Sequence, residues 1–228
     1  MNIIRIIDFL MTCCWMTTYT LVLIGSLKYK TPLISPITQA IIAPFELGVF
    51  LGFLFGFLIS NYVFNYVLLA YLYWTAMEIA VIIVIAKQIK PSKPKLTSYI
   101  LFMILLTIFV LIYVNIFDFG MLYGSYIHTI IGMVFWYIYI LDPKYPMKPI
   151  SLAVFIVKLV GDILGFIVYR NYDGILIFVI AITLPIIDLF FIITYFYRKN
   201  NEDKYINLYN TKILPLLKNK KLTLDGRN

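Results

Sequence analysis

The sequence predicts an all-α, polytopic integral membrane protein, folded as a seven-transmembrane-helix bundle. Three observations predict it: apolar runs of about 20 residues recur along the chain, charge is scarce, and basic residues gather between the runs. Hydrophobic residues make up 62% of the 228 residues and charged residues 13%, about half the charge of a soluble domain. A chain of this length cannot bury several such runs in one water-soluble core, so we expect its solvent to be lipid.

Seven apolar runs are each long enough to cross the hydrocarbon core of a bilayer. They cover residues 6–26, 36–59, 64–86, 97–117, 121–141, 150–169 and 174–197. The first run follows Arg5, as in a signal peptide, but Asp8 interrupts it and no small-residue cleavage site follows, so we expect a retained span. The links are too short to fold alone. Any activity is therefore expected within the bundle or at its rim.

Lysine and arginine are distributed unevenly among the links. The links after the first, third and fifth spans hold two, four and two, those after the second, fourth and sixth hold none, none and one, and eight more follow the last span. Because cytoplasmic loops are enriched in basic residues, this pattern predicts the N-terminus outside and the C-terminus in the cytoplasm. The membrane domain is then 1–199 and a polar, basic cytoplasmic tail is 200–228. Apolar residues 213–217 leave two alternatives open for the tail, a short surface helix or a solvated segment.

Other classes of site receive no support from the sequence. The net charge of +8 does not indicate a nucleic acid partner, because the basic residues mark the links between spans. Cys13 and Cys14 are adjacent within an apolar run, which favours neither a disulfide framework nor a zinc site. We therefore expect no metal.

Ionisable side chains within the spans are the main candidate functional residues, because charge at membrane depth is costly. They are Glu46, Glu78, His128, Lys158, Asp162 and Asp188. In the predicted orientation all except the histidine lie about 12 to 18 Å from the cytoplasmic side. The histidine is nearer the outer face, as a packing residue or a supporting polar group.

Two interpretations of the charged groups stay open. Lys158 and Asp162 are four residues apart on one helix, so they can pair and hold the sixth span against its neighbours. Glu46, Glu78 and Asp188 have no partner nearby in sequence, and a carboxyl group in a medium of low dielectric constant favours its protonated form. Such a group is either a proton donor or neutral hydrogen-bonding glue between helices.

Aromatic residues make up 18% of the chain, and most are expected at the lipid interface. Those that line an internal cavity would offer π faces to a cationic intermediate. The candidates for this role are Trp15, Tyr19, Trp74 and Trp136.

An ordered set of features runs through nearly the whole chain. It comprises Trp15 and Tyr19, Lys28 and Lys30 before Pro32, the triplet Pro44-Phe45-Glu46, Trp74 with Glu78, Pro149-Ile150-Ser151 leading into Lys158-Leu159-Val160-Gly161, and Asp188. This set resembles the transmembrane terpene cyclases of fungal meroterpenoid and indole-diterpene pathways, such as the paxilline- and pyripyropene-pathway cyclases. Three departures stand out: Phe45 replaces a Trp, Glu78 replaces a more frequent Asp, and Asp162 replaces a Thr.

The resemblance implies a cyclase that starts a carbocation cascade by protonating an epoxide or a terminal alkene of a prenyl chain. It implies Glu46 and Asp188 as the essential acids, and Glu78 is the third catalytic candidate. No cofactor is expected for this chemistry, and without a DDxxD cluster we do not expect diphosphate ionisation. The substrate would be a lipid-soluble prenylated or linear terpenoid. The membrane would be the plasma membrane of a bacterium or the endoplasmic reticulum of a fungus.

Other functions remain open. A small proton-coupled transporter would use the same intramembrane acids as a relay, although no inverted repeat is visible. A membrane hydrolase or a structural subunit is also compatible with the composition. A retinal protein is not, because the seventh span has no lysine for a Schiff base.

Overall fold

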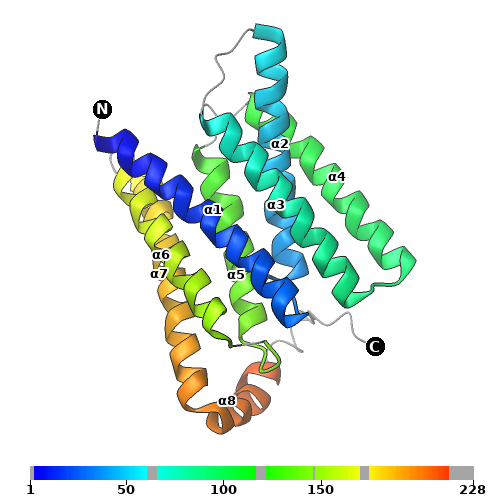
Figure 1. The fold of residues 1–228 in the computed structure, drawn as a ribbon, viewed down its shortest axis with the longest axis vertical. Helices are drawn as coiled ribbons and strands as arrows, with labels where there is room; N and C mark the ends of the chain where they lie inside the picture. The colour runs from blue at the N-terminus through cyan, green and yellow to red at the C-terminus, as the bar shows by residue number, and fades with distance from the viewer. Residues whose placement is uncertain (1–2, 61–65, 117–121, 146, 170–174, 216–228) are drawn as a thin grey trace.

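Helices make up the secondary structure in the computed structural model, which describes residues 3–60, 66–116, 122–145, 147–169 and 175–215. They are α1 (Ile3–Tyr29), α2 (Pro36–Ser60), α3 (Tyr66–Ile89), α4 (Lys93–Ile116), α5 (Leu122–Ile140), α6 (Pro149–Tyr169), α7 (Ile175–Asn200), α8 (Glu202–Leu208) and the π-helical turn η1 (Tyr209–Ile213). Figure 1 shows α1 to α7 running alternately up and down, with α8 under the base. The prediction of an all-helical chain is confirmed for the described residues, and the helix bounds differ from the predicted runs by four residues at most.

The surface of the bundle suits a lipid environment. Among the described residues, six helices are long and apolar enough to cross a membrane, namely α1, α2, α3, α4, α6 and α7. The apolar segment of α5 is shorter, Gly124–Ile140. Helix α4 exposes large apolar side chains such as Leu105 at 59% and Phe109 at 61%. Continuous apolar surface of this kind would aggregate in water and is stable against hydrocarbon.

The link between α1 and α2 is held by hydrogen bonds at the base of the bundle. Ser35 caps α2, because its Oγ accepts a hydrogen bond from the Thr38 N–H at 2.9 Å, and Pro36 takes the first helical position. The Leu33 carbonyl oxygen accepts a hydrogen bond from the Trp136 indole N–H at 2.8 Å. These contacts join the link to α5 and fix the orientation of the indole.

The tail becomes helical earlier than its sequence suggests. A surface helix around the apolar residues 213–217 was one of the two alternatives for the tail, whereas α8 begins at Glu202 and helical structure continues through η1. Tyr205 and Tyr209 are buried, and the guanidinium of Arg198 lies 4.9 Å from the Tyr205 ring. These aromatic contacts dock α8 against the bundle, which the polar composition of this segment conceals. Residues 216–228 lie outside the described residues.

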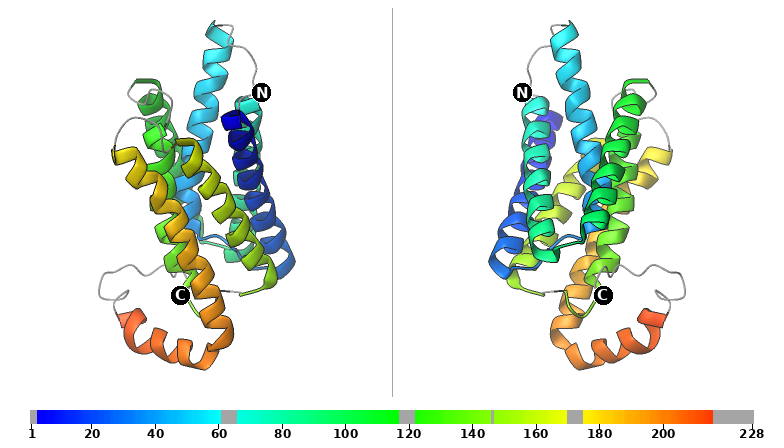
Figure 2. Two further views of the ribbon diagram at one scale, coloured as in Figure 1. Left: turned by 90° about the vertical axis from the view of Figure 1, so that its left-hand side faces the viewer. Right: turned by 90° about the vertical axis from the view of Figure 1, so that its right-hand side faces the viewer.

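The helices form two groups joined by α5. On one side α1 packs against α6, which packs against α7, and on the other side α2 packs against α3 and α4. Helix α5 contacts both α2 and α7, and α1 also contacts α3 (Figure 2). The space enclosed between the two groups is where the candidate site lies.

Candidate functional site

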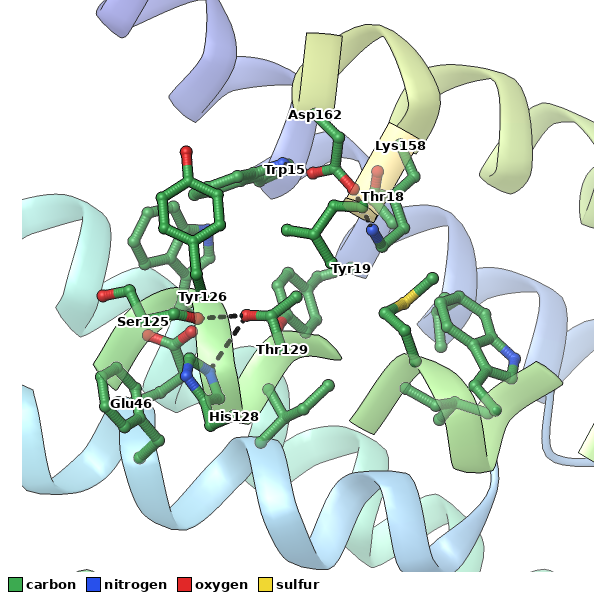
Figure 3. A pocket seen from close by; sticks show the side chains of 18 of the residues that line it. Trp15, Thr18, Tyr19, Glu46, Ser125, Tyr126, His128, Thr129, Lys158 and Asp162 are labelled. Carbon is green, nitrogen blue, oxygen red and sulfur yellow. Dashed lines mark hydrogen bonds and ion pairs between the residues drawn. The ribbon is translucent and has the colours of Figure 1, made fainter. Parts of the chain in front are cut away.

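A partly enclosed cavity lies in the interior of the bundle. It holds about 800 Å³ of empty space, a figure that includes its open mouth. Most of its wall is aromatic or aliphatic, and polar side chains gather at two ends (Figure 3). Its lining residues come from six helices and, for Ile34, from the link between α1 and α2: Trp15, Thr18, Tyr19, Val22, Ile34, Ile42, Phe45, Glu46, Tyr71, Trp74, Ser125, Tyr126, His128, Thr129, Met133, Trp136, Lys158, Asp162 and Leu184.

One polar end, the His128 end, consists of Glu46, Ser125, His128 and Thr129 (Figure 3). The imidazole ring of His128 is stacked on Phe45, with ring centroids 3.7 Å apart and planes at 12°. Glu46 is 9% exposed, and within the described residues its Oε2 atom has no hydrogen-bond partner. A buried carboxyl oxygen without a partner is costly. It is therefore available to a group that enters the cavity.

The other polar end, the Lys158 end, consists of Trp15, Lys158 and Asp162 and is held by charged hydrogen bonds. Lys158 Nζ lies 2.5 Å from Asp162 Oδ2, which is the i,i+4 pair considered from the sequence, and 3.3 Å from Asp188 Oδ1 on α7. The Trp15 indole N–H donates to Asp162 Oδ1 at 2.8 Å. One cation therefore neutralises one of two carboxylates, and the group is electrically neutral when it holds one further proton.

Tyr19 lies between the two polar ends (Figure 3). It is near enough to interact electrostatically with Glu46, Glu78 and Asp162. Glu78 is 1% exposed and interacts with Glu46 across the α2–α3 interface. Among the described residues its carboxyl oxygens have no hydrogen-bond partner of regular geometry, although the Tyr19 hydroxyl lies beside them. Tyr19 thus lies within electrostatic range of the acids at both ends.

Aromatic faces form the walls between the ends. The Trp15 and Trp74 rings lie 6.0 Å apart, and Tyr71 meets Trp74 edge to face at 5.0 Å. Trp136 lies 5.5 Å from the ring of Phe191 and is held through its indole N–H. All three tryptophans of the chain line this one cavity. Such walls exclude water and present electron-rich faces to a positively charged group.

The structure brings eight of the ten sequence-predicted site residues to the cavity wall. They are Trp15, Tyr19, Glu46, Trp74, His128, Trp136, Lys158 and Asp162. The other two are buried behind it: Asp188 is 0% exposed and contacts Lys158, and Glu78 is 1% exposed and lies beside Tyr19. Asp188, for which the sequence suggested no partner, is therefore paired with a cation on another helix.

Six polar or aromatic lining residues were not among the predicted ones: Thr18, Phe45, Tyr71, Ser125, Tyr126 and Thr129. A signal for two of them exists in the sequence. Ser125 and Thr129 lie three residues before and one after His128, so all three lie close to one face of α5. Single hydroxyl side chains are common in membrane helices and do not by themselves indicate a site. Only their position beside His128 makes Ser125 and Thr129 candidates.

Neither a metal-binding cluster among the described residues nor a similar protein points to a function for this site. Within the part of the chain that the structure describes, no group of three or more His, Cys, Asp or Glu side chains is placed to hold a metal ion. Comparisons with protein-family models, curated proteins and solved structures find no match to this chain.

Proposed function

We propose that this protein is a membrane-bound terpene cyclase that protonates an epoxide or alkene of a prenyl chain and cyclises it through a carbocation. The observation that carries this proposal is the presence of the Glu46 carboxyl group in the same largely apolar cavity as the aromatic side chains. A lipid-soluble chain can enter such a cavity from the bilayer, and a carboxyl group without a partner can transfer a proton to it.

The topology that accompanies this proposal has seven spans, with α5 as the shortest. The basic links after α1, α3 and α5 and the end of α7 lie at the same end of the bundle (Figure 1). Their positive charge supports a cytoplasmic location for this end and an external N-terminus. Because each span carries the chain across the membrane, an external N-terminus and a cytoplasmic C-terminus require an odd number of spans.

Glu46 is the proton donor in this mechanism. Its O–H bond breaks as the proton moves to the epoxide oxygen or to one carbon of the alkene, and the resulting cation is attacked by the electron pair of a second double bond. The aromatic faces of Trp15, Trp74 and Trp136 stabilise the cation, and the absence of bulk water prevents its capture as an alcohol. Loss of a proton from carbon ends the cascade. The product is then an isomer of the substrate.

Asp188 and Lys158 have a positioning role. Asp188 does not line the cavity, so it acts through Lys158, which pairs with Asp162, and Asp162 accepts the hydrogen bond of the Trp15 indole. Glu78 supplies a second buried carboxyl group, within electrostatic range of Glu46, as the reserve from which a spent proton is replaced.

The test is a conversion assay on membranes that carry the wild type or the Glu46→Gln variant. The panel contains epoxidised and plain prenylated aromatics and linear terpenols, and products are followed by mass spectrometry. We expect an isomer of unchanged mass from the wild type and at least a 100-fold lower rate from the variant, as for loss of a general acid. Glu202→Gln, at an exposed acid on α8, is the matched control and keeps the wild-type rate.

Two results would contradict the proposal. Undiminished cyclisation by Glu46→Gln removes this residue from the acid role. Proton-coupled uptake of a terpenoid into vesicles without chemical change, abolished by Glu46→Gln, would identify a transporter that uses the same intramembrane acids.

A further inference from the structure

The hydrogen bonds of His128 determine which of its ring nitrogens carries a proton. Nδ1 lies 2.8 Å from the Gly124 carbonyl oxygen, and a carbonyl oxygen only accepts hydrogen bonds. Nδ1 therefore carries a hydrogen. In the neutral ring the second nitrogen, Nε2, then carries a lone pair, and stacking on Phe45 fixes the direction in which that lone pair points.

The neighbour of this nitrogen already has a closer acceptor for its own hydrogen. Thr129 Oγ1 lies 3.3 Å from Nε2, but it donates its single hydrogen to the Ser125 carbonyl oxygen at the shorter distance of 2.6 Å. While Thr129 donates to Ser125, two acceptor atoms face each other with no hydrogen between them. A doubly protonated imidazolium would supply the hydrogen, but it would place a full positive charge on the aromatic stack at membrane depth.

We propose that the His128 end of the cavity binds a hydroxyl group of the ligand, so that the substrate class is a prenyl compound with a free hydroxyl. The hydroxyl donates its hydrogen to His128 Nε2, and its oxygen is within the same polar group as the unpartnered Oε2 of Glu46. The apolar chain then extends along the tryptophan walls toward the Lys158 end. The prenyl part of this inference rests on the proposed function. The hydroxyl part rests on the hydrogen bonds of His128 and Thr129.

A pair of ligands that differ in one hydrogen-bond donor tests the inference. Farnesol donates a hydrogen bond, whereas farnesyl methyl ether has the same chain and no donor. Tryptophan fluorescence of the purified protein in detergent reports their binding, because all three tryptophans line the cavity. We expect the wild type to bind the alcohol about 3- to 10-fold more tightly than the ether, the range for one net hydrogen bond.

Variants assign the preference to named atoms. His128→Phe keeps a ring for stacking but has no acceptor, so the ratio of the two dissociation constants should fall to about 1. His128→Gln carries a carbonyl oxygen near the position of Nε2 and should keep a ratio above about 2. Thr183→Val is the matched control, because Thr183 donates to Val179 in the same way on α7, away from the cavity. Circular dichroism and elution volume verify that each variant is folded.

Each outcome is decisive. Equal affinity for alcohol and ether in the wild type, or an unchanged preference in His128→Phe, overturns the hydroxyl site. Binding of neither ligand overturns both this site and the prenyl chain of the proposed function. A preserved alcohol preference together with an absence of cyclisation supports the hydroxyl site and removes only the cyclase.

Discussion

The indole of Trp15 lies against the backbone of Gly161, where an added Cβ atom would come within 2.7 Å of Trp15 Cδ1. The same indole donates its N–H to Asp162, the next residue of α6. The absence of a side chain at Gly161 is therefore what allows α1 and α6 to close around the Lys158 end of the cavity. Small residues serve this purpose where membrane helices approach closely.

Gly161→Ala should displace the Trp15 ring and weaken its hydrogen bond to Asp162. We expect a destabilisation of about 1 to 3 kcal/mol, the range for overpacking, and a shift of the tryptophan emission maximum. Gly165→Ala is the control on the same helix, since its added carbon meets the flexible Met11 Sδ at 3.2 Å. Thermal unfolding in detergent measures both variants. Equal losses of stability in the two variants would show that the close contact with Trp15 adds nothing to the cost of an alanine at position 161.

The buried ion pairs join α6 to α7. Lys158→Met leaves Asp162 and Asp188 in the interior without a cation, and we expect a loss of about 3 kcal/mol in unfolding free energy. Because Asp188→Asn removes one of these carboxylates, the double variant should lose less than the sum of the single variants by about 1 kcal/mol or more. Unfolding titrations in mixed micelles give the unfolding free energies of the wild type, the two single variants and the double variant. Strict additivity would mean that the two residues are not coupled.

Arg198 connects the end of α7 to the 141–148 link. Its guanidinium donates to the carbonyl oxygens of Ile140 at 2.6 Å and Pro143 at 2.8 Å. Tyr205 adds a bond from its hydroxyl to the Leu141 carbonyl oxygen, and burial raises the pKa of this tyrosine, so the hydroxyl stays a donor at neutral pH.

Arg198→Lys should therefore release α8, because an ammonium group cannot reproduce the fork of the guanidinium. We expect faster hydrogen exchange in residues 141–148 and in α8, with unchanged ligand binding in the distant cavity. Lys199→Arg, at the exposed neighbouring position, is the control. If the exchange rates in Arg198→Lys equal those of the wild type, the guanidinium bonds do not hold this end of the bundle.

The predicted orientation is open to cysteine labelling on intact cells. In a background with Cys13 and Cys14 replaced by Ser, a membrane-impermeant maleimide should label Asp173→Cys directly. It should label Ser92→Cys, in the basic link after α3, only after permeabilisation. Asp173 itself lies outside the described residues, and its placement follows from the sequence. Labelling of Ser92→Cys in intact cells would reverse the orientation.

Much of the candidate site was visible in the sequence because charge and tryptophan are conspicuous within apolar runs. The pairing of Lys158 with Asp162 follows from their spacing on one helix and is confirmed. The contact of Lys158 with Asp188 was not predictable, because it depends on how two separate helices are rotated. The unusual hydrogen bonding at His128 depends on bond lengths to Gly124 and Thr129, which no residue pattern encodes.

The sequence by itself determined the seven long helices, their bounds to within four residues and the apolar surface that suits lipid, because these depend on local hydrophobicity and on the length of each apolar run. It also supplied the ionisable residues as candidates, since each is costly wherever the span places it. Only the tertiary structure decided which of them share a cavity. That choice depends on the side-chain packing that sets the rotation of each helix about its axis, and in a chain that is apolar on nearly every face, periodicity leaves that rotation undetermined.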